Sequence, residues 1–214
     1  MVAGLVEWYA ENGRDFSWRG PGAYQPWQVL VIEILLQQTQ AARVAEFLPG
    51  FFHRYPTLPS MRVAGEAALA DALHPLGLHR RRAARLCALA ASLDKLGDRV
   101  PRGREELEAL PGVGQYVASA ALANLYGDAE PTIDVNMARL VERLYGPRRL
   151  ADLRKDPHIQ GVSRRLLAAA ERPAELNWAV LDLGSAHCRA RTPVCDSCPL
   201  RTPCPTRLLR ADDR

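Results

Sequence analysis

Two carboxylic acids stand at positions that packing alone does not explain. Glu33 lies inside the apolar run Val31-Ile32-Glu33-Ile34-Leu35-Leu36, where an ionised carboxylate is costly unless it is paired. Burial raises the pKa of such a carboxyl group, which then can donate a proton near neutral pH. The alternative is a structural role, in which Glu33 pairs with an internal arginine or caps a neighbouring helix. The second acid, Asp134, follows a tight turn and an apolar helix.

That turn is the string Leu110-Pro111-Gly112-Val113-Gly114, followed by a stretch rich in alanine. Pro111 ends the preceding helix because it lacks a backbone donor, and Gly112 and Gly114 permit positive φ angles. The pattern predicts two helices joined by the turn, the second beginning near Gln115. A helix N-terminus offers N–H groups and the positive end of a dipole to a phosphate. A phosphate-binding turn with an acid behind it indicates chemistry on a nucleic acid, although most Pro-Gly turns between helices are only structural.

Four of the five cysteines lie close together near the C-terminus, with the spacing Cys-x6-Cys-x2-Cys-x5-Cys. They are Cys188, Cys195, Cys198 and Cys204. The N-terminus has no secretion signal, so such a group argues for a metal centre rather than for disulfides. Four thiolates suit either a tetrahedral zinc ion or an iron–sulfur cluster. The clustering of four cysteines does not by itself distinguish the two, and without other information a structural zinc ion is the default interpretation. Cys87 stands alone in an apolar helix and is expected to be a small core residue.

The composition is that of an ordinary globular chain of 214 residues, 48% of them hydrophobic. No apolar run is long enough to span a membrane, and a cytoplasmic, nucleoid-associated monomer is expected. The net charge of +4 suits a nucleic-acid partner only if the basic residues gather in one place. They do so at His79-Arg80-Arg81-Arg82 with Arg85, although such a run is more often a solvated helix face.

Helical periodicity recurs along most of the chain and predicts an all-α fold. The continuous apolar stretch at residues 29–32 would also suit a buried strand, but its continuation to Leu36 favours a helix. No alternating strand pattern is present. The expected helices cover residues 2–11, 27–40, 43–55, 65–73, 80–96, 104–110, 115–125, the stretch from Asn136 to Tyr145, 164–171 and 174–186.

Three features together resemble the helix-hairpin-helix DNA glycosylase superfamily, which includes endonuclease III, the adenine glycosylase MutY and the mismatch thymine glycosylase Mig. They are the Leu-Pro-Gly-Val-Gly turn with Asp134 twenty residues after Gly114, the string Glu33-Ile34-Leu35-Leu36-Gln37-Gln38-Thr39-Gln40, and the cysteine spacing. The resemblance covers roughly residues 4–205. It implies a six-helix barrel lobe at residues 24–130 that contains the hairpin, and a second lobe of residues 1–23 and 131–205 with a [4Fe-4S] cluster on the four cysteines. Residues 206–214 would form a tail.

The resemblance also implies catalytic roles. Glu33 would be the general acid that protonates the leaving base, and Asp134 would stabilise the cationic sugar with support from Asn136. Tyr116 stands where endonuclease III has the lysine that forms a Schiff base. A monofunctional glycosylase is therefore implied, in which Tyr116 would help to position groups in the site.

The implied partner is double-stranded DNA with a mismatched or damaged base pair. In this superfamily the hairpin contacts phosphates, the glutamine pair reaches into the gap left by the extruded base, and a second loop wedges the duplex open. The matching residues here are Gln37, Gln38, His79, Arg80, Gly112, Val113 and Gly114.

The excised base stays open between two branches of the superfamily. The string Gln37-Gln38-Thr39-Gln40 favours MutY, and so adenine opposite guanine or 8-oxoguanine, which is the leading interpretation. Trp178 departs from the glutamine that many MutY sequences have at this place. Ala41, the string at residues 14–19 and the length of 214 residues resemble Mig, which removes thymine or uracil opposite guanine. A non-catalytic DNA-binding iron–sulfur protein is a third alternative. The presence of both acids argues against it, because a pure binder needs neither.

Overall fold

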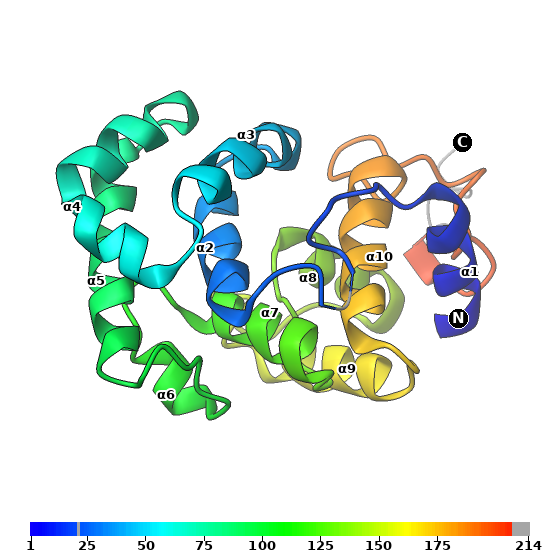
Figure 1. Ribbon diagram of the computed structural model, residues 1–214. Coiled ribbons are helices and arrows are strands. Elements are labelled where there is room, and N and C mark those ends of the chain that lie inside the picture. Colours follow the sequence, from blue (N-terminus) through cyan, green and yellow to red (C-terminus); the bar gives the residue numbers. More distant parts are fainter. Residues whose placement is uncertain (21, 207–214) are drawn as a thin grey trace. The chain divides into compact units, whose positions relative to one another are not determined.

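The computed structural model describes residues 1–20 and 22–206, and its regular structure is entirely helical (Figure 1). This part of the chain contains ten α-helices and one short 3₁₀ helix and no β-strand, so the all-α prediction is confirmed. Close contacts divide the chain into two compact units, residues 16–121 and residues 1–15 with 122–214. The division falls earlier in the chain than the predicted boundaries at 23/24 and 130/131. The predicted tail, residues 206–214, lies outside the described residues except for Thr206.

The unit of residues 16–121 is built from helices that are consecutive in the sequence. Its α4 packs along α5, and α2 contacts both α3 and α5. The apolar α2 is buried along most of its length, because it is hydrophobic on every face. The elements are α2 (Pro26–Leu36), α3 (Ala41–Arg54), α4 (Leu58–Leu73), the 3₁₀ helix η1 (His74–Leu76), α5 (His79–Asp94), α6 (Arg104–Glu108) and the first part of α7 (Gln115–Tyr126).

Two helix boundaries in this unit differ from the predicted ones by more than two residues. Helix α2 ends at Leu36 rather than at Gln40, because Gln38 has a φ of 59° and cannot continue the helix. Helix α4 begins at Leu58, well before the predicted start at Gly65. The glycine instead makes a kink inside α4, with φ 73° and ψ 176°.

The other unit combines the two ends of the chain. Helix α1 (Val2–Asn12) packs on α10 (Pro173–Ala186), which also contacts α8 (Val135–Tyr145) and α9 (Pro157–Ala168) (Figure 1). The segment after α1 is tied to α10 by an ion pair, with 2.6 Å between Arg14 Nη2 and Oδ1 of the buried Asp182. Helix α9 begins earlier than predicted because the buried Asp156 caps it by accepting a hydrogen bond from Ile159 N. None of the helices in the described ranges is long and apolar enough to cross a membrane.

Candidate active site

Glu33 lies in α2 with only 7% of its surface exposed. Burial raises the pKa of its carboxyl group from 4.5 to about 7, and the positive charge of Arg19 opposes the shift. The Arg19 guanidinium lies 5.0 Å from the centre of the Phe16 ring, which stacks on Trp18 at 4.6 Å. Glu33 is therefore a carboxyl group that is protonated in a large fraction of molecules at neutral pH.

Asp134 is the N-cap of α8. Its Oδ1 accepts hydrogen bonds from the backbone N–H groups of Asn136 and Met137, both at 2.9 Å, and Asn136 Nδ2 donates to Oδ2 at 2.7 Å. Burial raises the pKa of Asp134, whereas these three hydrogen bonds and the nearby Arg139 lower it. Asn136, predicted to support the acid, lies directly beside it. Burial is the largest of these effects, so the net shift of the Asp134 pKa is upward even though the contacts favour the charged form.

Arg139 is a residue of this site that the sequence analysis missed. Its Nη2 donates to Asn136 Oδ1 at 2.6 Å, and its Nε donates to the carbonyl oxygen of Cys188, also at 2.6 Å. Gly184 lies against the same asparagine so closely that a Cβ there would come within 2.6 Å of Asn136 Cβ. Asp134, Asn136 and Arg139 thus form a continuous polar chain that reaches the start of the cysteine loop. The available signal was the spacing of Asn136 and Arg139, three residues apart on one helix.

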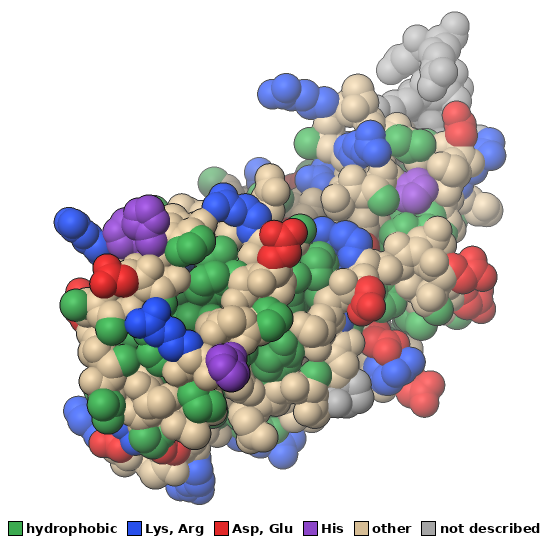
Figure 2. All heavy atoms as spheres, turned by 45° about the horizontal axis from the view of Figure 1, so that its top comes forward, with side chains coloured by type: hydrophobic (Ala, Val, Ile, Leu, Met, Phe, Trp, Pro, Cys, Tyr) green, Lys and Arg blue, Asp and Glu red, His purple; other side chains and the backbone are tan. Residues whose placement is uncertain are grey.

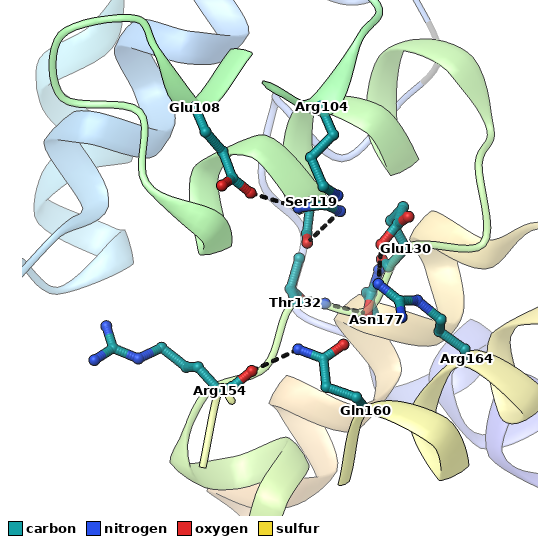
Figure 3. A network of polar contacts seen from close by, with 9 residues as sticks. All are labelled: Arg104, Glu108, Ser119, Glu130, Thr132, Arg154, Gln160, Arg164 and Asn177. Atoms are coloured by element: carbon teal, nitrogen blue, oxygen red, sulfur yellow. Dashed lines mark hydrogen bonds and ion pairs between the residues drawn. The ribbon is translucent and has the colours of Figure 1, made fainter. Parts of the chain in front are cut away.

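Asn177 is a second missed residue, and it fixes the segment that leads to Asp134. Only 1% of Asn177 is exposed, and Figure 3 shows it directed toward Thr132. Its Oδ1 accepts a hydrogen bond from Thr132 N at 3.1 Å, and its Nδ2 donates to the carbonyl oxygen of Glu130 at 3.0 Å. A polar residue inside the apolar α10 was the signal, because a buried amide needs partners.

The predicted hairpin is formed by α6, a turn at residues 109–114 and α7. Val113 N donates to the carbonyl oxygen of Leu110 at 3.0 Å and closes the turn. Of the two glycines in the turn, only Gly112 has a positive φ, at 84°. Gly114 has no positive φ, and a Cβ atom at this position would meet no atom within 4 Å. The Val113 side chain is buried, so only its backbone can meet a ligand. Tyr116 lies half-buried in the first turn of α7.

The two glutamines after α2 have different environments. Gln37 is bound on both sides, since its Nε2 donates to Gly112 O at 3.4 Å and its Oε1 accepts from Arg85 Nη1 at 3.2 Å. The side chain of Gln38 is exposed, and its backbone has a left-handed conformation with a φ of 59°. Both line a pocket whose other residues are Ile34, Leu78, Arg81, Arg82 and Arg85. The structure therefore ties Gln37 to the hairpin and presents Gln38 to the solvent.

The loop expected to act as a wedge also differs in detail from the prediction. His79 is half-buried, and its ring lies 4.9 Å from that of His74. Leu78, with 48% of its surface exposed and a φ of 52°, is the apolar residue that projects from this loop. Sequence patterns do not reveal a left-handed leucine, because this conformation is rare for residues other than glycine.

The predicted basic cluster is smaller than the sequence indicates. Arg80 and Arg81 are exposed, but Arg82 is buried inside the unit. On the face shown in Figure 2, Lys and Arg side chains are dispersed among acidic and apolar ones.

The four clustered cysteines line one pocket together with Arg143, His187, Pro193, Val194, Arg201 and Thr206. Arg143 Nη1 lies 3.1 Å from Cys188 Sγ. Burial raises the pKa of the Cys198 thiol, and the other three cysteines raise it further. Among the described residues, however, no three His, Cys, Asp or Glu side chains form a group that could hold a metal ion. His187 packs edge-on against Trp8.

The predicted site residues divide between the two units. Residues 16–121 contain Glu33, Gln37, Gln38, His79, Arg80, Gly112, Val113, Gly114 and Tyr116. Asp134, Asn136 and the four clustered cysteines belong to the other unit, where Arg139 links Asn136 to the backbone of Cys188.

Comparison with known proteins identifies a family of similar chains. The family described as HhH-GPD superfamily base excision DNA repair protein matches residues 31–155. A thymine-DNA glycosylase of Aeropyrum pernix is 36% identical over 204 residues, which are 94% of this chain and 91% of that protein. An adenine DNA glycosylase of Mycobacterium tuberculosis is 40% identical over 198 residues, but the chain covers only 64% of its length.

Two solved structures are similar over nearly the whole chain. A thermostable thymine-DNA glycosylase has a TM-score of 0.87 at 25% identity, covering 97% of this chain and 95% of that one. A non-covalent endonuclease III–DNA complex has a TM-score of 0.78 at 25% identity, covering 99% and 95%. The chain therefore belongs to the HhH-GPD superfamily of base excision DNA repair proteins.

Proposed function

We propose that this protein is a DNA N-glycosylase that hydrolyses the bond between a mispaired base and its sugar. The observation that carries the proposal is the buried Glu33 carboxyl group, whose pKa of about 7 suits a proton donor. Relatives with the names thymine-DNA glycosylase and adenine DNA glycosylase support it.

The chemistry assigns a different task to each acid. Breaking the N-glycosidic bond leaves negative charge on the departing base and positive charge on the sugar, after the nucleotide has been swung out of the duplex. Glu33 protonates the base, and the charged Asp134 stabilises the sugar cation until water adds. Asn136 orients Asp134 through the hydrogen bond between Nδ2 and Oδ2, and Tyr116 helps to position groups in the site.

Contacts with the duplex come from three places. The backbone of Gly112, Val113 and Gly114 meets phosphates at the N-terminus of α7, where the helix dipole is positive. Gln38 and Leu78 enter the duplex, which their exposure supports, while Gln37 holds the hairpin. The exposed Arg80 and the half-buried His79 flank the Leu78 wedge and contact the backbone of the DNA.

Adenine opposite guanine or 8-oxoguanine is the proposed target. It is supported by the Gln-Gln-Thr-Gln string and by 40% identity to a protein with the name adenine DNA glycosylase. Thymine or uracil opposite guanine is the second candidate. It is favoured by the similarity to thymine-DNA glycosylases over nearly their whole length.

A panel of mismatched duplexes, treated with the protein and then with alkali to cleave abasic sites, tests both targets. Strand cleavage at adenine supports the first, and cleavage at thymine or uracil supports the second. Cleavage on no duplex in the panel would contradict the glycosylase proposal itself.

The enzyme is expected to be monofunctional, because Tyr116 offers no amine for a Schiff base. Base release should proceed without strand cleavage, and borohydride should trap no covalent adduct with DNA. Tyr116→Lys tests the position by placing an amine there, and a trapped adduct is expected only in this variant. The chain has just two lysines, Lys95 and Lys155, so an adduct trapped in the wild type would mean that one of them or the N-terminal amine is the nucleophile.

The proposal includes a [4Fe-4S] cluster on Cys188, Cys195, Cys198 and Cys204, with one thiolate for each iron. The pocket that the four cysteines share supports it, as does their spacing in the sequence. When bound, the cluster would hold the loop after α10 in place. Its contribution is structural, and the hydrolysis needs only the acids.

Anaerobically prepared protein is expected to be yellow-brown, with about four irons per chain and broad absorbance near ~400 nm. Cys198→Ala should lose most of the iron. Cys87→Ala is the matched control and should keep it, since Cys87 lies in α5 of the other unit. One zinc per chain in place of iron would overturn the cluster assignment.

The hairpin should govern affinity for every duplex alike. Gly114→Leu is expected to weaken binding by about tenfold on paired and mismatched DNA, because a side chain there blocks the backbone from phosphate. The structure has open space at this position, so folding should be unaffected. Gly50→Leu, in equally open space on α3, is the control and should bind normally. Full affinity in Gly114→Leu would show that DNA is held elsewhere.

A further inference from the structure

The pocket that follows α2 is lined by two non-glycine residues with a left-handed backbone conformation. Three described residues other than glycine have a positive φ, and two of them, Gln38 and Leu78, line that same pocket. A left-handed conformation is unfavourable for a residue with a side chain, so it persists only where the surrounding structure imposes it. The two lie in different loops, 40 positions apart in the sequence.

Arg82 contacts both loops from its place in the first turn of α5. On one side it binds three successive carbonyl oxygens, through Nη1 to Leu76 at 2.9 Å, through Nη1 to Gly77 at 2.7 Å and through its backbone N to Leu78 at 2.9 Å. On the other side its Nη2 donates to the carbonyl oxygens of Leu35 at 3.2 Å and Gln37 at 2.6 Å, and to the Thr39 hydroxyl. The carbonyls of Gly77 and Gln37 directly precede the two left-handed residues.

The burial of Arg82 indicates that its hydrogen bonds to backbone carbonyl groups are needed in the folded protein. Only 3% of the residue is exposed, and the oxygens that its side chain binds are all neutral. Burial lowers the pKa of the guanidinium and Arg85 lowers it further, yet an arginine keeps its charge in a protein. A buried charge is unfavourable compared with an apolar side chain of similar size, unless its hydrogen bonds are needed. Here they satisfy carbonyls that the end of α2 and the left-handed loop leave without helical partners.

We infer that Arg82 is a positioning residue, which holds Gln38 and Leu78 as a pair in the conformations with which they enter the duplex. The inference rests on the proposed function. According to this inference, Arg82 increases the affinity for DNA with an unpaired site relative to fully paired DNA. It contributes little to the affinity for paired DNA. Each terminal nitrogen of the guanidinium binds one loop, Nη1 the loop before α5 and Nη2 the loop after α2, whereas a lysine would have to reach both loops from a single nitrogen.

The test uses the full chain and two duplexes that differ only in one tetrahydrofuran abasic-site analogue. Arg82→Lys is expected to reduce the ratio of the two affinities by about tenfold, as the loss of hydrogen bonds to several buried carbonyls implies. Affinity for the paired duplex should change by less than about threefold. The fluorescence of 2-aminopurine opposite the analogue should fall as well, because the wedge no longer unstacks its surroundings.

A second measurement separates positioning from a general loss of stability. Gln38→Ala with Leu78→Ala should lower the same ratio, and adding Arg82→Lys to this pair should lower it by less than about twofold more. Independent losses that multiply would overturn the inference, as would a folded Arg82→Lys protein with the wild-type ratio. Arg81→Lys, an exposed arginine of the same pocket, is the matched control and should affect both duplexes equally. Because binding is measured without chemistry, the test can fail or succeed whether or not a base is excised.

Discussion

Replacing Glu33 by glutamine is expected to reduce single-turnover base excision by at least about a hundredfold, the usual contribution of general acid catalysis. Glutamine has the shape of the protonated acid but cannot give up a proton in the same way, so the affinity for duplex DNA should be retained. Glu46→Gln, an exposed acid on α3, is the matched control and should excise normally. Full excision by Glu33→Gln would remove this residue from the mechanism.

The same substitution should stabilise the protein, because it removes a carboxylate from an apolar helix. The pKa of Glu33 is about 7 in the folded chain and 4.5 for the ordinary group. Between these pH values the folded protein therefore keeps a proton on Glu33 that the unfolded chain has lost. Stability therefore falls as pH rises from about 4.5 to 7 and levels off above. Above pH 7 the variant should be more stable by about 3 kcal/mol, which thermal unfolding at pH 5 and pH 8 would measure. A difference that does not depend on pH would show that Glu33 titrates normally.

Asp134→Asn is expected to bind duplex DNA and to lose excision by about a hundredfold or more, because the negative charge that meets the sugar cation is gone. Asparagine is itself a good N-cap, so α8 should still form. Asp156→Asn is the matched control, since Asp156 caps α9 in the same unit. That change should lower stability but leave excision by the folded protein intact. Equal loss of excision in both variants would reduce Asp134 to a structural cap.

The two acids together predict a bell-shaped dependence of excision on pH. Activity should fall above about pH 7, where Glu33 loses its proton. It should also fall at acid pH, at a value above the ordinary pKa of aspartate, because burial raises the pKa of Asp134. Single-turnover rates across the pH range measure both limbs. A rate that keeps rising above pH 7 would exclude a proton donor with this pKa.

Those parts of the molecule that depend on local sequence could be predicted, and those that depend on distant contacts could not. The apolar run around Glu33 is local, and so are the proline and glycines of the hairpin, which explains why the helices there were anticipated. The end of α2 was not, because Arg82 in α5 takes up the carbonyl groups that a longer helix would have used. Nothing near Arg82 distinguishes it from its exposed neighbour Arg81.

The support of Asp134 was hidden for the same reason. Asn177 and Gly184 belong to α10, more than forty positions along the chain from the segment that they hold. Only Asn136 could be inferred, since it lies two residues from the acid and fits a known string. In a sequence, the main sign of such long-range polar contacts is a single polar residue in an apolar helix, because a buried polar group needs a partner.

The packing of α1 on α10 has a consequence for the order in which the protein can fold as it is made. A chain leaves the ribosome from its N-terminus at roughly 5–20 residues per second, and domains tend to fold as they emerge. Residues 16–121 can do so early, while α1 must wait with an apolar face, including Leu5, until α10 has been translated. That delay is on the order of ten seconds or more, a period in which a nascent chain is open to chaperones and to aggregation. The unit that contains Asp134 is thus the last to be completed, so a truncated product of translation would have Glu33 but no finished partner unit.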